Sequence, residues 1–597
     1  MKLPPMIVEE TAGPKWRYAE LPGYEILSRC DDARTRQLFL AFYRAHALLG
    51  AMLPARFQLE LDVPKAMIFY DEELWPVAQQ ETVAAMLGLH PPSRPEASRD
   101  EESPRQSARD ALVPSSGLSA LGLKPRGENR TSMFFSNMCL SDTDSLTTFA
   151  LVSHAVIDEQ DTFLTPAYVE TLLNRRTPQL PAWFRAGFLK LYEKLRVQDG
   201  AMTIMRPSEM SVASSSAPLS FSVSPRSFYS TSPRFMKSEV KEDISLNIGP
   251  SYLGAPSFAP LSKTLVNGVL SIGEVLNGNA LKNGLNESIW LAEIELFVRW
   301  GIDPSDASRS RAFWQFIERA VSEPFSEKLF QECFGFDFAE GTQQLTAFLP
   351  SSDRMKWSLG KESFHIRPLE IREASRGEIS RIKGEWERLE TRYIKMNLPD
   401  LELLFVKQAR GTLRRAFDKG DRDPRLVATL GLLEVDAGES SVARGYFEGE
   451  PNKALVRPRA NFELARLRYD ETDGRSHRDD GKISEEQAFF VVEPLLIASR
   501  QKPSISQVYE LMADVWVNCV APPPPAVLDA LKMGVRLFPR DGELVYRVAV
   551  LNAVNDPREA SRLVKLGIQY AANDSAKLRF LELRGKLARP TVPDPHH

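Results

Sequence analysis

Apolar residues in the first part of the chain follow two different spacings. Residues 35–53, TRQLFLAFYRAHALLGAML, repeat apolar positions three and four apart, which is typical of an amphipathic helix. Residues 65–71, KAMIFYD, form a short apolar run after Pro64 and predict a buried strand. Further strands are expected at 131–140 and 147–158, followed by helices from Pro166 to about Arg176 and from Pro181 onward. This mixture predicts an α+β lobe.

The spacing becomes wholly helical from residue 271 to 350, where IWLAEIELFVRWGI, RAFWQFIERAV and TQQLTAFL each carry an apolar face. We expect a helical half-domain here that completes a first domain over residues 16–350. A polar connector follows over residues 351–372, with a possible strand at SFHIRPLEI.

Residues 373–588 predict an all-α region built from pairs of helices. Small residues that let neighbouring helices approach closely recur in it, at Ala428, Gly431, Ala437, Gly438, Ala443, Ala460 and Ala465. The pattern resembles tetratricopeptide repeats with irregular periods, and this resemblance implies a right-handed solenoid of antiparallel helix pairs. The leucines expected between neighbouring helices are Leu430, Leu464, Leu511, Leu531 and Leu551.

Two segments break the apolar pattern. Residues 91–130 are rich in Pro, Ser and charged residues, and residues 207–241 in Ser, Pro and aromatic residues. Such compositions cannot supply packed regular elements, so we expect two irregular insertions outside the main cores.

Composition narrows the possible functions. Hydrophobic residues make up 43% of the 597 positions, so most of the chain can fold, and at this length at least two domains are expected. The 75 basic and 79 acidic residues give a net charge of -4, which argues against nucleic acid as a partner. No apolar run is long enough for a transmembrane helix, and no secretory signal is expected at the start.

The chain around residues 166–193, PAYVETLLNRRTPQLPAWFRAGFLKLYE, resembles the peptidase MA-like branch of the gluzincin metallopeptidases. In that family HExxH on one helix is followed by a W-x-x-E-G segment that opens the next. KAMIFYDEE upstream, and LFVRWG, FWQFIERA and FQECFGFDF downstream, extend the resemblance over most of residues 16–350. It implies a metallopeptidase-like fold.

The zinc chemistry of that family is missing from the matching positions. Pro166 and Glu170 stand where the family has its two histidines, Ala167 where it has the general base, and Ala186 where it has the third ligand. A catalytic zinc needs three protein ligands, and only Glu170 could touch a cation. No pair of internal histidines is spaced i, i+4, and no CxxC pair occurs among the four cysteines. We therefore expect no zinc, no other cofactor and no catalytic residues.

Each of these positions also has a structural interpretation, which we favour. Pro166 is typical of the first residue of a helix with Thr165 as its N-cap. Trp183 and Phe184 are more often core residues than the wall of a ligand-binding cleft. His154 after an apolar run is more often a satisfied strand histidine than a ligand.

Two functions are compatible with this pattern. The first is a non-catalytic scaffold, in which a degenerate peptidase-like lobe carries helical repeats that bind protein partners or subunits of a larger assembly. The alternative is a hydrolase or peptide-binding protein that uses the remodelled cleft without zinc. The resemblance implies a bacterial envelope or exported setting with the signal absent from this chain; otherwise a cytoplasmic one is expected.

Overall fold

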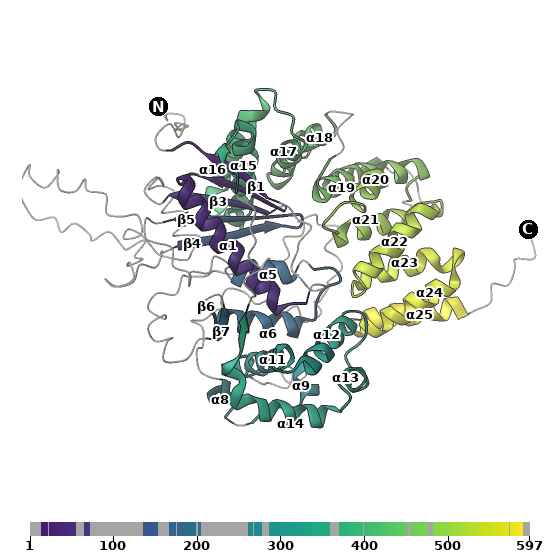
Figure 1. Ribbon diagram of the computed structural model, residues 1–597. Coiled ribbons are helices and arrows are strands. Elements are labelled where there is room, and N and C mark those ends of the chain that lie inside the picture. The colour runs from purple at the N-terminus through teal and green to yellow at the C-terminus, as the bar shows by residue number, and fades with distance from the viewer. Residues whose placement is uncertain are drawn as a thin grey trace, which may run out of the picture.

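The computed structural model describes residues 14–21, 23–54, 65–71, 135–152, 166–174, 176–198, 201–204, 261–266, 268–277, 286–358, 369–397, 399–449, 455–475, 482–571 and 573–588. Within them the protein is mostly helical, with a small mixed sheet at the N-terminus and a helical C-terminal part (Figure 1). The insertions expected at 91–130 and 207–241 lie outside the described residues, as does His154.

The larger sheet has six strands in the order β4-β5-β3-β2-β1-β9. Its parallel pairs are β2 with β3 and β3 with β5, whereas β1–β2, β4–β5 and β1–β9 are antiparallel. The strands are β1 (Arg17–Leu21), β2 (Tyr24–Ser28), β3 (Lys65–Asp71), β4 (Phe135–Asp142), β5 (Ser145–Val152) and β9 (Arg372–Glu373).

Helices cover both faces of this sheet. Since successive side chains of a strand point to opposite faces, each strand contributes apolar residues to two cores. In β3, Met67 and Phe69 join a core with helix α1 (Asp32–Met52), whose Leu38 and Phe42 are buried against the sheet. On the other face the cluster that includes Ile68 and Tyr70 packs on α15 (Arg376–Asn397), through its residues Ile382, Trp386 and Leu389.

Helices of the middle of the chain pack below the sheet, around α6 and α11 (Figure 1). Gly187 of α6 permits this contact, since a Cβ there would lie 2.7 Å from the carbonyl oxygen of Ile294 in α11. The helices are α5 (Pro166–Asn174), α6 (Ala182–Glu193), α8 (Leu261–Thr264), α9 (Ile272–Leu276), α11 (Glu287–Ile302), α12 (Ala307–Ser322), α13 (Glu327–Phe334), α14 (Phe338–Phe348) and the 3-10 helix η5 (Leu349–Arg354). A second sheet joins β6 (Leu195–Gln198), β7 (Ala201–Ile204) and β8 (Lys356–Ser358).

The C-terminal part is a series of helices in which consecutive members pack together. It starts on the sheet with α15 and ends beside the middle helices, where Arg540, in the turn before α23, donates a hydrogen bond to the Ala320 carbonyl of α12 (Figure 1). After α15 come η7 (Pro399–Leu401), α16 (Glu402–Phe417), α17 (Pro424–Asp436), α18 (Ser440–Glu448), α19 (Pro458–Arg475), α20 (Glu485–Ala498), α21 (Ser506–Val517), α22 (Pro525–Leu537), α23 (Gly542–Asn555), α24 (Pro557–Tyr570) and α25 (Asp574–Ala588).

The apolar pattern located the C-terminal core well. Leu430, Leu464, Leu511 and Leu531 are buried, whereas Leu551 is only partly buried. The helices expected from Pro166 and Pro181 are α5 and α6, and the strand expected at 65–71 is β3. The first helix after the connector, α15, covers the sheet as well as opening the helical series.

A buried network of charged residues joins the tip of the β4–β5 hairpin to the helical series. Arg388 of α15 is fully buried and donates hydrogen bonds to Asp142 (2.8 Å), Glu385 (3.0 Å) and Asp436 (2.7 Å). Burial alone would raise the pKa of Asp142, but Arg392 and Arg388 hold it well below its ordinary value. Charge pairing therefore fixes this hairpin against the helices.

Candidate functional site

The segment that resembles the metallopeptidase motif folds as the helix pair α5 and α6. α5 begins at Pro166 and α6 follows Pro181, as expected from the preference of proline for helix starts. Ala186 lies on α6 and is 2% exposed within the core, and Glu170 lies on α5 with partial exposure. The side chains of Pro166 and Ala167 lie outside what the structure describes.

The position matching the third zinc ligand offers no donor atom, since Ala186 has only a buried methyl group. The residues present therefore do not fit the zinc of the metallopeptidase family. Within the described ranges, no three His, Cys, Asp or Glu side chains gather into a group that could hold a metal ion.

Trp183 and Phe184 are core residues. The ring of Trp183 lies 5.4 Å from that of Phe297, and the ring of Phe184 lies 5.6 Å from that of Trp314. Both side chains are under 8% exposed, at 7% and 0%. A role for either in lining a cleft stays a prediction.

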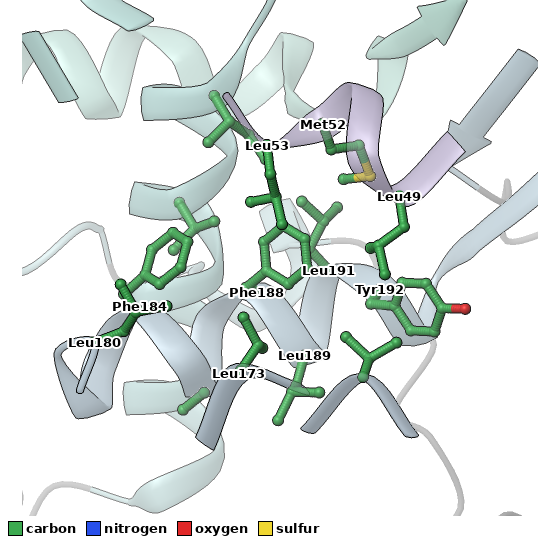
Figure 2. Packing of buried hydrophobic residues seen from close by; sticks show 14 of the residues in the cluster. Leu49, Met52, Leu53, Leu173, Leu180, Phe184, Phe188, Leu189, Leu191 and Tyr192 are labelled. Carbon is green, nitrogen blue, oxygen red and sulfur yellow. The ribbon is translucent and has the colours of Figure 1, made fainter. Parts of the chain in front are cut away.

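Figure 2 shows why α6 is held firmly. Side chains from the end of α1 (Leu49, Met52), from α5 (Leu173) and from α6 (Phe188, Leu191) gather in one apolar cluster. Burying a side chain of this size contributes about 1.5–3 kcal/mol, so the cluster fixes the position of the neighbouring polar residues of α6.

Arg185, directly before Ala186, is the polar residue of α6 that the sequence analysis missed. It donates a hydrogen bond to Oδ1 of Asn174 at the end of α5. Burial lowers the pKa of Arg185 to about 10, the Glu170 carboxylate acts to raise it, and the charge of Arg540 lowers it further. The charge of an arginine in the turn between α22 and α23 thus acts on Arg185.

A second candidate is a surface pocket of 470 Å³ on the helical series, between α16, α17 and α18. It is lined by apolar and aromatic side chains together with Arg422. Phe417, Val427, Val442, Tyr446 and Leu455 are among the lining residues.

The aromatic wall of this pocket is organised by ring contacts. Phe417 and Tyr446 meet edge to face with centroids 5.4 Å apart, and the guanidinium of Arg422 lies 3.8 Å from the centroid of Phe417. Arg414 donates to the Tyr446 hydroxyl at 3.3 Å. Val442 is 38% exposed, so an apolar side chain of the lining reaches solvent.

Sequence reasoning did not find this pocket. Its residues come from three helices and the chain before α19, and each one has an ordinary type for a helix face. Only their juxtaposition creates the hollow, and a single sequence carries no signal for it.

Comparison of the chain with models of protein families, with curated proteins and with solved structures gave no match. None of the helices in the described part of the chain combines the length and the apolar character needed to cross a membrane.

Proposed function

We propose that the protein is a non-catalytic interaction protein, whose helical C-terminal part binds a protein partner in the pocket between α16, α17 and α18. The observation that carries the proposal is the pocket itself, which is concave, apolar and partly open. Its volume lies in the range of pockets that bind small molecules or anchor side chains. A large apolar side chain of a partner would fill it, with Arg422 at its lining facing polar groups of the partner chain.

Exposed apolar residues elsewhere on the helical series support a binding surface. Leu403 and Leu404 of α16 are 76% and 53% exposed, and Phe489 and Phe490 of α20 are also exposed. Large exposed apolar side chains are costly to leave in water, and interaction surfaces are where they gather. The proposal includes that the helices form a right-handed solenoid with the partner on its concave side.

The resemblance to metallopeptidases supports the non-catalytic part of the proposal. A peptidase-derived lobe without a ligand at Ala186 could serve as a platform for the helices, in an envelope or exported setting. The competing hypothesis is a hydrolase or peptide-binding protein that uses the old cleft without zinc.

Substitution at the pocket tests the binding proposal. Val442→Asp places a carboxylate in the apolar pocket, and we expect it to abolish capture of the partners that the wild-type chain enriches from its native cells. The matched control is Leu578→Asp on α25, which changes an exposed leucine (57%) away from the pocket and should leave capture intact. Partners retained by Val442→Asp and lost by changes at Arg185 or Glu170 would support the old cleft instead.

Elemental analysis tests the absence of zinc chemistry. Because Ala186 cannot coordinate a metal, purified protein should contain far less than one zinc per chain. Stoichiometric zinc that disappears in the Glu170→Ala variant would overturn the proposal, as would cleavage of peptide substrates that this variant lacks.

A further inference from the structure

The pocket between α16, α17 and α18 has an aromatic wall that is in contact with two positive charges. Phe417 and Tyr446 meet edge to face in this wall. The guanidinium of Arg422 lies 3.8 Å from the ring centroid of Phe417, and Arg414 donates a hydrogen bond of 3.3 Å to the hydroxyl of Tyr446. Each ring of the wall therefore has an arginine side chain beside it.

The two arginines are held in different ways. The Nη1 atom of Arg422 donates to the carbonyl oxygens of Phe417 (2.5 Å) and Asp421 (2.9 Å), which fixes this guanidinium at the lining. The carboxylate of Asp421 accepts a hydrogen bond from the backbone nitrogen of Asp423 at 2.9 Å. Arg414 is exposed in the last turn of α16, so its positive charge can be reached by a ligand beside the aromatic wall.

One face of α18 lines the pocket and leaves part of its own backbone uncovered. Val442, Gly445, Tyr446 and Gly449 are spaced three and four residues apart, so they share a face of this helix. Gly445 is exposed, and a Cβ atom there would meet no atom of the described residues within 4 Å. Glycine is less favourable than alanine inside a helix, and these neighbours do not require it. It leaves the backbone of α18 open to the close approach of a ligand.

We propose that the pocket takes an aromatic side chain that has an acidic residue next to it, from a partner segment that crosses α18 at Gly445. This inference rests on the proposed function and specifies the chemistry of the partner. An aromatic ring fits the wall because edge-to-face and stacked contacts with Phe417 and Tyr446 add to the burial of apolar area. An acidic neighbour fits because the exposed charge of Arg414 attracts a carboxylate at the rim of the pocket.

Three dipeptides, Asp-Trp, Asp-Leu and Asn-Trp, each with an acetylated N-terminus and an amidated C-terminus, test this chemistry. Each is titrated against the full chain, and ligand-observed NMR gives its dissociation constant. We expect Asp-Trp to bind about three- to tenfold tighter than Asp-Leu, because the ring adds aromatic contacts. It should bind about two- to fivefold tighter than Asn-Trp at low salt. The second difference should shrink at about 1 M salt, where the Debye length is about 3 Å.

Alanine at Gly445 tests the close approach to α18. Gly445→Ala places a methyl group at the pocket and should bind Asp-Trp about tenfold more weakly. The same variant should melt no lower than wild type, because alanine favours the helix and meets no described neighbour. The matched control is Gly411→Ala in α16, where a Cβ atom also has open space. It should melt no lower than wild type and keep the full affinity.

Glutamine at Arg414 tests the charge. Arg414→Gln should remove the preference for Asp-Trp over Asn-Trp, whereas Arg415→Gln, at the next exposed arginine of α16, should keep it. The inference is wrong if no dipeptide binds, if Asp-Leu binds as tightly as Asp-Trp, if the two glycine variants bind alike, or if Arg414→Gln keeps the preference.

These failures are distinct from a failure of the proposed function. If Val442→Asp loses the partners that the wild-type chain captures, the pocket remains the docking site and only the aromatic and acidic chemistry of its ligand is overturned. If Val442→Asp retains those partners, the proposed function falls and this inference falls with it.

Discussion

A single aspartate illustrates how far apart in sequence the partners of this fold lie. Asp144, in the tip of the β4–β5 hairpin, accepts a hydrogen bond from the backbone nitrogen of Arg459 at 3.1 Å and pairs with the side chain of Arg457. Arg459 lies in the first turn of α19, whose free N–H groups are usually capped by the residue just before the helix. Here Asp144, from the β4–β5 hairpin, caps the N–H group of Arg459 instead.

Asp144→Asn should therefore destabilise the protein strongly. The amide keeps an acceptor for Arg459 but removes one of the two carboxylates that pair with Arg457, the other being Glu385, so we expect a loss of about 1–3 kcal/mol of unfolding free energy. Urea denaturation measures it. Glu559→Gln, which breaks the exposed pair with Arg562, is the control and should cost less than about 1 kcal/mol. Equal losses for the two variants would contradict the contribution of the ion pair between Asp144 and Arg457.

At the scale of elements, continuous apolar runs were the easiest to predict. Residues 65–71 are buried on both faces of the sheet, so their composition identified β3 with its correct bounds. By contrast, β9 has two residues and pairs with β1 across most of the chain, and no local pattern indicates such a partner. Helices were expected from residue 373 onward, but a helical pattern does not say that the first of them, α15, covers a sheet.

Two helical glycines, Gly187 at the contact between α6 and α11 and Gly411 of α16, should respond to alanine with opposite changes in stability. Gly187→Ala would place a methyl group 2.7 Å from the Ile294 carbonyl oxygen and should cost about 1–3 kcal/mol of unfolding free energy. Gly411→Ala in α16 meets no atom within 4 Å and should stabilise the helix by up to about 1 kcal/mol. Thermal unfolding of the two variants beside wild type checks both. A neutral Gly187→Ala would mean that the two helices can move apart freely.

For the whole molecule, buried carboxyl groups set the dependence of stability on pH. Burial raises the pKa of Glu293 to about 7 and that of Glu390 to about 8, and burial together with Asp541 raises that of Glu510 to about 8. In the unfolded chain these groups ionise near their ordinary pKa, about 4.3. Between about pH 4.5 and 8 the folded protein holds protons that the unfolded chain releases, so stability falls as pH rises through this window.

Glu390→Gln should remove part of this fall. The amide cannot ionise, so the variant should gain about 2–4 kcal/mol over wild type at pH 8 and little at pH 4.5. Denaturation at a series of pH values measures the difference. Glu486→Gln, at an exposed position on α20, should follow the wild-type curve. A Glu390→Gln curve parallel to that of wild type would show that Glu390 ionises normally in the folded state.

The position of α15 on the sheet has a consequence for synthesis on the ribosome. Strands β1 to β5 are complete once residue 152 has been made, but the helix that covers one face of their sheet ends at residue 397, which is 397 − 152 = 245 residues later. At about 5–20 residues per second this interval lasts roughly 12–50 s. Throughout it the apolar side chains Leu27, Ile68 and Phe149 have no covering helix. We therefore expect chaperones that bind exposed apolar strands to hold the nascent chain of this protein, and α15 to cover the N-terminal sheet only after the middle helices have emerged.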